Sequence, residues 1–430
     1  MSAQRWPQKG LKRGCTGWPQ RTHFGAATRT PNSFGSPSSV MTEYLRDFTQ
    51  RSSVLGWVGP ACYHRAMTDD LYGLHFDTAL TPQQLFHAHV VYGRQYPAVP
   101  RPPRKANPKI RVGYVSGDFY SHAAAYFLLP LLDAHDREKF EIFLYSKTKK
   151  TDAVTARFKQ RGHWRELSAD DAEAFQMIQA DVIDILVDCS GHTPGNSLSL
   201  FALRPAPVSV TFLGYPNTTG LSQIDYRLTD RIIEPEGALA TEQLVRLPHG
   251  IHTYRPLNDT DEPKPRSGPI VFANLGRAKK ATPRAVALWN RILDAVPGAE
   301  LVLNVERALT LPEYFKIFDK LDIVLDTFPY NGTTTICDAL YMGVPVVTLQ
   351  GDRTCARVGA SLLTHIGLPE FIATTEDDYV RIAVEAARDR VQLNALRTGL
   401  RARFLASPLG NPRFVVGDLE AFYVEALERV

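Results

Sequence analysis

The chain has 430 residues, of which 44% are hydrophobic and 22% are charged. This composition is that of an ordinary globular protein, and the length predicts two or three domains. No apolar run is long enough to span a membrane. The net charge of +4 is too small to argue for or against nucleic acid, and we expect neither a nucleic-acid nor a membrane partner. The five cysteines lack metal-ligand spacing, which favours plain thiols in a reducing, cytoplasmic compartment.

The first 42 residues contain no Asp or Glu and are rich in Ser, Thr, Gly and Pro. Such a composition cannot bury a core and predicts disorder. It has some features of an organellar transit peptide. A solvated tail, or upstream sequence with Met41 as the true start, is the favoured interpretation. We treat residues 1–70 as a disordered or atypical N-terminal segment.

Two helical fragments are predicted near the N-terminus, at 42–51 and 81–96. The second has Thr81 as its N-cap and Pro82 as its first residue, a strong helix start. A stiff Pro-rich linker at 99–108 follows. Residues 71–108 therefore form a helical segment and linker ahead of the first domain.

From Ile110 onward, short β-branched runs alternate with helical segments, which predicts parallel sheets covered by helices. The alternation comes in two sets, separated by a stretch rich in Pro and charge at 259–267. The first set comprises strands 110–116, 140–146, 183–188 and 207–213 and helices 123–135, 152–161, 169–180 and 196–203. The second comprises strands 270–274, 299–304, 322–326 and 345–349 and helices 283–295, 311–319, 333–342, 355–366, 376–388, 391–405 and 413–427.

This order predicts an α/β protein with two Rossmann-like parallel-sheet domains, at 109–266 and 267–430, that face a cleft. That architecture is the GT-B fold of glycosyltransferases. Ligands of open α/β sheets bind beyond the carboxyl ends of the strands. The loops at those ends are therefore where functional residues are expected.

The most informative of these loops precedes the helix predicted at 333–342. Pro329 and the Asn331-Gly332 pair mark a turn, and Thr333, Thr334 and Thr335 stand where the helix begins. Unpaired N–H groups and the positive end of the helix dipole favour an anion there. Asp338, one turn further, would reach a ribose hydroxyl if a nucleotide diphosphate occupied the site. For three threonines alone, a plain capped turn is an equally good interpretation.

Three loops of the first domain carry further candidates. His122 follows the first strand, at a predicted helix N-terminus where the dipole keeps an imidazole neutral and able to act as a base. A capping or exposed histidine is the alternative. His192 would line the cleft or bond its own loop. The loop 212–220 would contact acceptor or donor, or be a simple turn, and its candidates are Tyr215, Pro216 and Thr218.

Cations gather in two loops of the second domain. Arg277, Lys279 and Lys280 precede the helix start Thr282-Pro283. A cation beside a leaving diphosphate stabilises the charge that develops there, although a solvated basic loop is the commoner case. A second pair, Arg353 and Arg357, would add positive potential near the phosphates or pair with Asp352.

Together these motifs resemble the catalytic region of the O-linked N-acetylglucosamine transferase family, including its bacterial and SPINDLY-like members. The resemblance runs from about Tyr72 to the C-terminus and is carried by the segments 111–122, 185–195, 202–220, 272–283 and 322–367. It implies two Rossmann-like lobes. It also implies transfer of a sugar, with inversion and without a metal, from a nucleotide diphosphate to Ser or Thr hydroxyls of proteins.

The resemblance also implies roles for individual residues. His122 matches the active-site histidine, and Lys280 matches the lysine that holds the donor diphosphate. Arg277 falls where a donor-contacting Gln is usual. The phosphate-binding turn and the ribose-binding acid correspond to Thr333, Thr334, Thr335 and Asp338.

The sequence departs from the family in three ways. The tetratricopeptide array that precedes the catalytic region is missing, and Gly276-Arg277 replaces an Asn-Gln pair. Between Leu303 and Leu311 the chain is shorter by roughly one helix–strand unit, on the order of 30 residues. We expect this deletion to weaken base recognition and to remove a central element of the second sheet.

The sequence therefore predicts a transferase of N-acetylglucosamine from UDP-N-acetylglucosamine to protein hydroxyls, with no cofactor or metal. Two alternatives remain open. One is a GDP-fucose-dependent protein O-fucosyltransferase. The other is a degenerate domain that binds nucleotide or protein without turnover.

Overall fold

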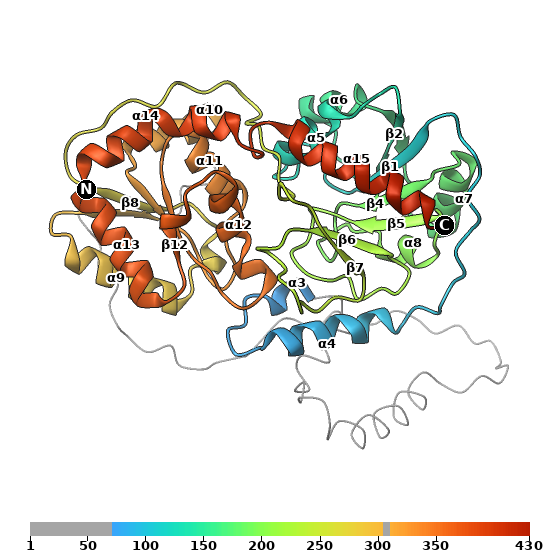
Figure 1. The fold of residues 1–430 in the computed structure, drawn as a ribbon, viewed down its shortest axis with the longest axis horizontal. Coiled ribbons are helices and arrows are strands. Elements are labelled where there is room, and N and C mark those ends of the chain that lie inside the picture. The colour runs from blue at the N-terminus through green and yellow to red at the C-terminus, as the bar shows by residue number, and fades with distance from the viewer. Residues whose placement is uncertain (1–70, 304–309) are drawn as a thin grey trace, which may run out of the picture. The chain divides into compact units, whose positions relative to one another are not determined.

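The computed structural model describes residues 71–303 and 310–430, and its elements are shown in Figure 1. Two predictions fall outside the described residues, namely the disorder of residues 1–70 and the helix at 42–51. Of the helices within the described ranges, none is both long and apolar enough to cross a bilayer.

The first sheet has seven parallel strands in the order β3-β2-β1-β4-β5-β6-β7. The strands are β1 Ile110–Ser116, β2 Phe140–Ser146, β3 His163–Glu166, β4 Ile185–Asp188, β5 Val208–Thr211, β6 Tyr226–Thr229 and β7 Gln243–Arg246. The helices between them are α5 Ala125–Ala134, α6 Ala153–Lys159, α7 Asp171–Ala180 and α8 Leu198–Ala202. The predicted strands 110–116 and 140–146 match β1 and β2 at both ends. The edge strand β3 was not predicted, because its sequence is polar and half-exposed.

The second sheet has five parallel strands in the order β12-β11-β10-β8-β9. Its strands are β8 Val271–Asn274, β9 Glu300–Leu303, β10 Ile323–Leu325, β11 Val346–Leu349 and β12 Ile372–Ala373. The helices are α9 Pro283–Ala295, α10 Leu311–Ile317, α11 Thr334–Tyr341, α12 Val358–His365, α13 Glu376–Arg388 and α14 Arg390–Ala406. Short 3-10 turns are η1 Ala278–Lys280, η2 Phe318–Lys320, η3 Thr354–Ala356 and η4 Pro369–Phe371. The predicted α/β architecture of two Rossmann-like sheets is confirmed.

The centre of the second sheet is complete, so the expected loss of a central element is wrong. Phe272 in β8 is in register with Leu301 of β9 on one side and with Ile323 of β10 on the other. In a doubly wound sheet the strands that follow the first are added outward, before the chain crosses to the other side. A unit inserted between β9 and β10 would therefore extend the sheet beyond β9. The shortened segment leaves β9 as an edge, where Leu303 is 39% exposed.

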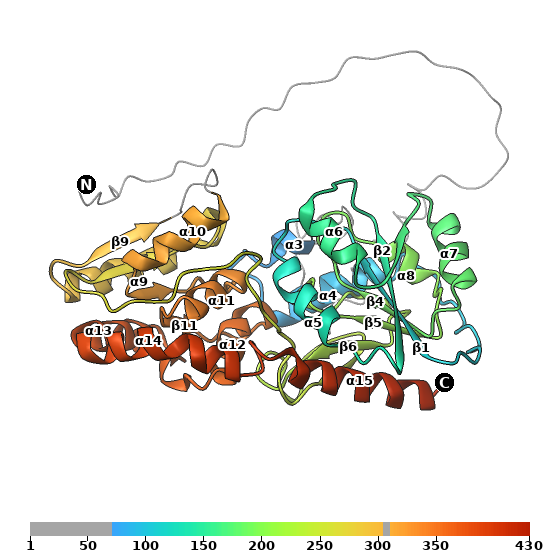
Figure 2. The same cartoon turned by 90° about the horizontal axis from the view of Figure 1, so that it is seen from above.

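The last helix, α15 Pro412–Glu428, packs with the first sheet, although the sequence grouped it with the second domain. Figures 1 and 2 show it beside α5. Val415, Leu419 and Tyr423 are buried in the same core as Val112 of β1. A hydrogen bond between His135 Nδ1 and the Glu420 carboxylate, at 2.8 Å, adds a polar contact. Contacts between residues far apart in the sequence determine which sheet this helix packs against, and the local sequence pattern does not reveal them.

Within the described residues, the helices α3 Leu71–Leu74 and α4 Pro82–Gly93 precede the first sheet. The predicted start of α4 is confirmed: Thr81 accepts a hydrogen bond from the Gln84 N–H in a capping box. The end of α4 approaches the loop after β5 closely. A Cβ added at Gly93 would lie 1.7 Å from the Gly220 carbonyl oxygen, so only glycine fits there.

Candidate functional site

The loops after β8 and β10 are joined through Lys280. Its Nζ donates to the Asn331 carbonyl at 2.6 Å and lies 4.1 Å from the centre of the Tyr330 ring. Thr282 caps α9 through the Ala285 N–H and donates its hydroxyl proton to the Phe328 carbonyl at 3.2 Å. The structure therefore places Lys280 beside the turn that leads into Thr333, which is the juxtaposition that their predicted roles require.

The Lys280 side chain is partly buried. Burial lowers its pKa to about 8, while the Asp326 carboxylate opposes that shift. Burial also raises the pKa of Asp326 to about 6, against hydrogen bonds from the Gly332 N–H and the Thr348 hydroxyl. At neutral pH the lysine still carries its charge. A positive charge in such surroundings interacts more strongly with an anion than it would in water.

The turn before α11 is fixed by hydrogen bonds, mostly to backbone groups. Asp326 accepts from the Gly332 N–H at 2.8 Å and from the Thr348 hydroxyl at 2.7 Å. Asn331 donates to the Thr327 carbonyl at 2.8 Å and accepts from the Gly359 N–H at 3.1 Å. This rigid turn sets the direction in which α11 starts.

The helix α11 begins at Thr334, with Thr333 as its N-cap residue. Thr333, Thr334 and Thr335 are half-buried, so their hydroxyls lie at the boundary between protein and solvent. The first N–H groups of a helix have no intrahelical acceptor and favour an anion. The arrangement thus suits a phosphate, and the phosphate-binding role of the threonines stays a prediction.

Asp338 is more enclosed than the sequence suggested. The residue is only 3% exposed. Its carboxylate accepts hydrogen bonds from the Tyr254 hydroxyl and, at 2.8 Å, from the Tyr314 hydroxyl. Burial raises its pKa to about 7, against the effect of the two hydroxyls. Contact with a ribose stays a prediction and would require one tyrosine to move. Sequence reasoning missed both tyrosines, and the local pattern gives no signal for either.

His122 lies at the start of α5, as predicted. Its Nδ1 accepts from the Ala124 N–H at 3.3 Å and lies 3.6 Å from an Asp118 carboxylate oxygen. Burial lowers its pKa, Asp118 opposes this, and the charges of Arg277 and Lys150 lower it further. This lowered pKa favours the neutral imidazole that a general base requires. Arg277, itself exposed, acts on a histidine of the other sheet domain.

Three of the four predicted acceptor-side residues, His192, Tyr215 and Thr218, lie in the protein interior. His192 is 4% exposed and its Nε2 bonds the Thr219 carbonyl at 2.7 Å, while burial lowers its pKa to about 3. The Tyr215 hydroxyl bonds the Nε2 atoms of His75 and His89, each at 2.8 Å. Pro216 is half-buried. These contacts give the residues structural roles, and a role towards an acceptor stays a prediction.

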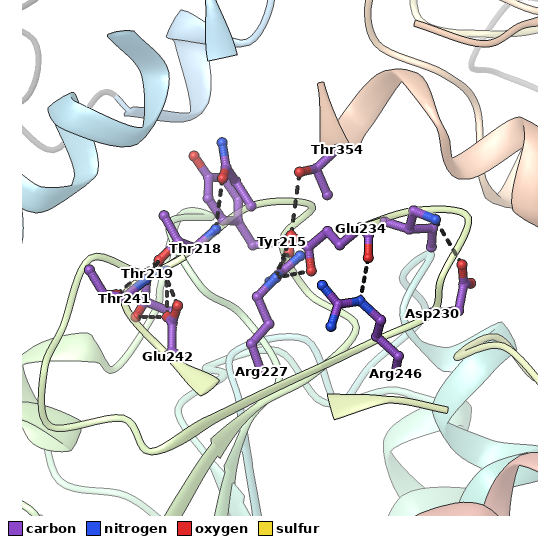
Figure 3. A network of polar contacts seen from close by, with 12 residues as sticks. Tyr215, Thr218, Thr219, Arg227, Asp230, Glu234, Thr241, Glu242, Arg246 and Thr354 are labelled. Carbon is purple, nitrogen blue, oxygen red and sulfur yellow. Dashed lines mark hydrogen bonds and ion pairs between the residues drawn. The ribbon is translucent and has the colours of Figure 1, made fainter. Parts of the chain in front are cut away.

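Figure 3 shows the polar network that holds the loop 212–220. Glu242 accepts from the Thr218 hydroxyl at 2.6 Å and from both the N–H and the hydroxyl of Thr219. Arg227 forms a buried ion pair with Glu234 at 3.1 Å and donates to the Tyr215 carbonyl. The Thr218 hydroxyl is thus hydrogen-bonded within the chain.

The two arginines after β11 are also hydrogen-bonded within the chain. Arg353 donates to the carbonyls of Asp77 and Leu80, and lies 3.7 Å from the Asp352 carboxylate. Arg357 donates to the Ile232 carbonyl at 2.6 Å. Across residues 71–303 and 310–430, no cluster of three or more His, Cys, Asp or Glu residues could hold a metal ion.

Two Rossmann-like sheets, with a cation and a helix start brought together at the strand ends of the second, define a protein of the glycosyltransferase class. The family model "Glycosyl transferase family 41" matches residues 86–254 and 312–419. The chain therefore belongs to glycosyltransferase family 41. The interval between the two matches, 255–311, contains Lys280 and the shortened segment.

Curated relatives point to the same family. The chain is 38% identical over 388 residues to a protein of Arabidopsis thaliana named "Probable UDP-N-acetylglucosamine–peptide N-acetylglucosaminyltransferase SPINDLY", covering 79% of this chain and 42% of the relative. It is 30% identical over 360 residues to the SEC protein of the same plant, whose name gives the same activity, covering 73% of this chain and 37% of the relative. The chain thus spans about two-fifths of the length of these relatives.

Among solved structures, the chain is similar to a mutant O-GlcNAc transferase of Thermobaculum terrenum. The TM-score is 0.81 and the identity 32%, with 91% of this chain and 81% of that chain covered. This likeness extends over both sheets and supports the same family and fold.

Proposed function

We propose that this chain transfers N-acetylglucosamine from UDP-N-acetylglucosamine to Ser or Thr hydroxyls of proteins, with inversion and without a metal. The observation that carries the proposal is the position of Lys280, whose Nζ lies 2.6 Å from the Asn331 carbonyl, immediately before the three threonines at the start of α11. The names of the relatives, which specify a UDP-N-acetylglucosamine donor and a peptide acceptor, supply the substrate class.

The proposed chemistry assigns one task to each group. The N–H groups and hydroxyls at the start of α11 bind the diphosphate, and the Lys280 ammonium stabilises the charge that develops on it. The acceptor oxygen attacks the anomeric carbon from the face opposite the diphosphate, so one C–O bond forms while the other breaks. His122, as a neutral imidazole, takes the hydroxyl proton directly or through one water.

Metal independence is part of this proposal, because Lys280 and the helix start supply positive charge at the leaving group. Transfer should persist in excess EDTA. A cytoplasmic location is also proposed. The three cysteines of the described residues, Cys189, Cys337 and Cys355, are free thiols, which suits a reducing compartment.

The test compares Lys280→Ala with Lys280→Arg and with the exposed control Lys320→Ala, using a labelled donor and a protein acceptor. Loss of a preorganised charge should reduce kcat on the order of 100- to 1,000-fold in Lys280→Ala, with the fold retained by circular dichroism. Lys320→Ala should match the wild type, and Lys280→Arg should retain partial activity. Undiminished turnover in Lys280→Ala would remove the lysine from the mechanism. A panel of UDP- and GDP-sugars, with GDP-fucose included, identifies the donor.

A second candidate is a domain that binds nucleotide or protein without turnover. It is favoured by the closure of Asp338 under Tyr254 and Tyr314, and by the absence of a family match over 255–311. Thermal stabilisation by UDP without hydrolysis or transfer of UDP-sugar would favour this candidate.

A further inference from the structure

Three aromatic rings from distant parts of the chain pack together beside Lys280. Tyr72 and Phe76 come from α3 and the residues after it, and Tyr330 comes from the turn before α11. Phe76 stacks on Tyr330 with centroids 5.1 Å apart, and Tyr72 meets both rings edge-on at 5.5 and 5.9 Å. We call these three residues the aromatic triad. The proposed reaction gives none of them a task.

Two neighbouring lysines lie over the aromatic triad. The Lys279 Nζ is 4.4 Å from the ring centres of both Tyr72 and Phe76, and the Lys280 Nζ is 4.1 Å from that of Tyr330. These distances are well inside the cation–π range of about 6 Å. All three residues of η1 are exposed or half-exposed, so core packing does not hold this turn in place. The contacts with the rings, together with the hydrogen bond from Lys280 to the Asn331 carbonyl, therefore hold it.

The segment that carries two of the rings is firmly anchored. Leu71 and Leu74 are buried, and His75 bonds the Tyr215 hydroxyl at 2.8 Å. Arg353, itself only 7% exposed, donates to the Asp77 carbonyl at 3.0 Å and to the Leu80 carbonyl at 2.5 Å. The segment that carries Tyr72 and Phe76 is thus hydrogen-bonded to the first sheet domain through Tyr215 and to the second through Arg353.

We propose that Tyr72, Phe76 and Tyr330 are positioning residues that hold η1 through Lys279 and fix the Lys280 ammonium beside the start of α11. This inference rests on the proposed function of Lys280 and extends the machinery to an N-terminal helix outside both sheets. The rings do not touch the reacting atoms. They act by keeping the cation in one place and by excluding water from it.

The protonation of Lys280 reports on this support. The charged and titratable groups around it are Asp326 at the end of β10, Cys355 in η3, and Arg277 and Lys279 in its own loop. Burial is the largest cause that lowers its pKa to about 8, and the Tyr330 ring covers one side of the ammonium. Opening the aromatic triad admits water, so the Lys280 pKa should rise toward the ordinary lysine value.

The first experiment measures kcat/KM against pH for the wild type, Phe76→Ala and Phe76→Tyr. Only the protonated lysine stabilises the leaving group, so activity should fall as the pH rises through the Lys280 pKa. In Phe76→Ala we expect kcat to fall by about tenfold, as mispositioned catalytic groups do, and the alkaline midpoint to move upward. Phe76→Tyr, which keeps the ring, should restore both. Lys159→Met, which removes a cation–π contact with Trp164 at 5.1 Å, is the matched control and should change neither.

A loss of activity with an unchanged alkaline midpoint would assign Phe76 a merely structural role and overturn the proposal. Should Phe76→Ala fail to fold, Phe76→Leu removes the ring but keeps a large apolar side chain and the charge of Lys279, and it should move the midpoint in the same direction. An unchanged midpoint in that variant also overturns the proposal.

A second measurement separates this inference from the proposed function. The Lys280 pKa is determined without donor, by NMR of isotopically labelled lysines, with the signal assigned through Lys280→Arg. If the wild type transfers no sugar but its Lys280 pKa rises in Phe76→Ala, the proposed function fails and the support by the aromatic triad stands. If the wild type transfers sugar and the pKa is the same in both proteins, only the support fails.

Discussion

The loops after β8 and β10 differ from those after β4 and β5, although all four lie at carboxyl ends of parallel strands. In the second sheet, Lys280 and the three threonines of α11 remain half-exposed. In the first sheet, His192, Tyr215 and Thr218 are each at most 4% exposed. One set of loops thus keeps polar groups accessible to solvent, where we propose that the donor binds, while the other set is closed by hydrogen bonds within the protein. Partners and exposure, rather than position in the topology, distinguish the two.

The largest effect is expected from breaking the buried network of the first sheet. Glu242 is 5% exposed and accepts three hydrogen bonds, from Thr218 and Thr219. Glu242→Ala leaves these buried donors without an acceptor and should lower the free energy of unfolding by about 3–5 kcal/mol. Urea denaturation measures this change, with Glu242→Gln as the control that keeps an acceptor oxygen. A loss below about 1 kcal/mol, the value of an exposed contact, would show that the network does not hold the loop.

Asp338 tests whether the second sheet domain also contains a buried carboxylate that is held by hydrogen bonds, as Glu242 is in the first. Burial raises its pKa from 3.8 to about 7, so the folded protein binds this proton more tightly than the unfolded chain. Stability should therefore fall as the pH rises from about 4 to about 7. A shift of this size contributes up to about 4 kcal/mol. In Asp338→Asn that part of the pH dependence should vanish. Parallel stability curves for the two proteins from pH 4 to pH 8 would contradict the raised pKa.

Substitution of Tyr314 tests the role of Asp338 with a smaller expected loss of stability. Its hydroxyl donates to Asp338 at 2.8 Å, so Tyr314→Phe should lower the free energy of unfolding by about 1 kcal/mol. If Asp338 also takes a ribose hydroxyl, the variant frees an acceptor, and UDP should bind a few-fold more tightly in calorimetry. Reduced stability with unchanged UDP affinity would instead place Asp338 among the structural carboxylates, beside Glu242.

Much of the fold follows from local pattern. The strands β1 and β2 are seven-residue, largely apolar segments, and α9 Pro283–Ala295 has a Thr-Pro start, so their bounds could be read from the sequence. The strands β3 and β12 could not, because one is polar and half-exposed and the other has two residues. The return of α15 to the first sheet depends on a core that assembles only in three dimensions.

The site divides in the same way. The turn, the helix start and Lys280 carry local signals, namely Asn-Gly, consecutive threonines and a basic loop, and the structure brings them together. The partners of Asp338 lie 84 and 24 residues away, and Phe76 stacks on Tyr330 from another part of the chain. Such pairings depend on tertiary packing, and the spacing of residues within one segment does not predict them. For the same reason, the sequence could not show that Tyr215 and Thr218 face inward.

The smallest effect is expected at His122, where the first sheet contributes to the proposed chemistry. The Asp118 carboxylate, 3.6 Å from Nδ1, opposes the lowering of the His122 pKa by burial. Asp118→Asn removes that opposition, so the pKa should fall further and the acid limb of kcat/KM should move to lower pH. Because partly exposed ion pairs contribute at most about 1 kcal/mol, rates at neutral pH should change by less than about fivefold. The matched control is Asp171→Asn, whose carboxylate lies 3.8 Å from Lys147 and should leave the profile unchanged. An acid limb that stays in place in Asp118→Asn would mean that His122 is not the base, and the first sheet would then supply only structure to the site.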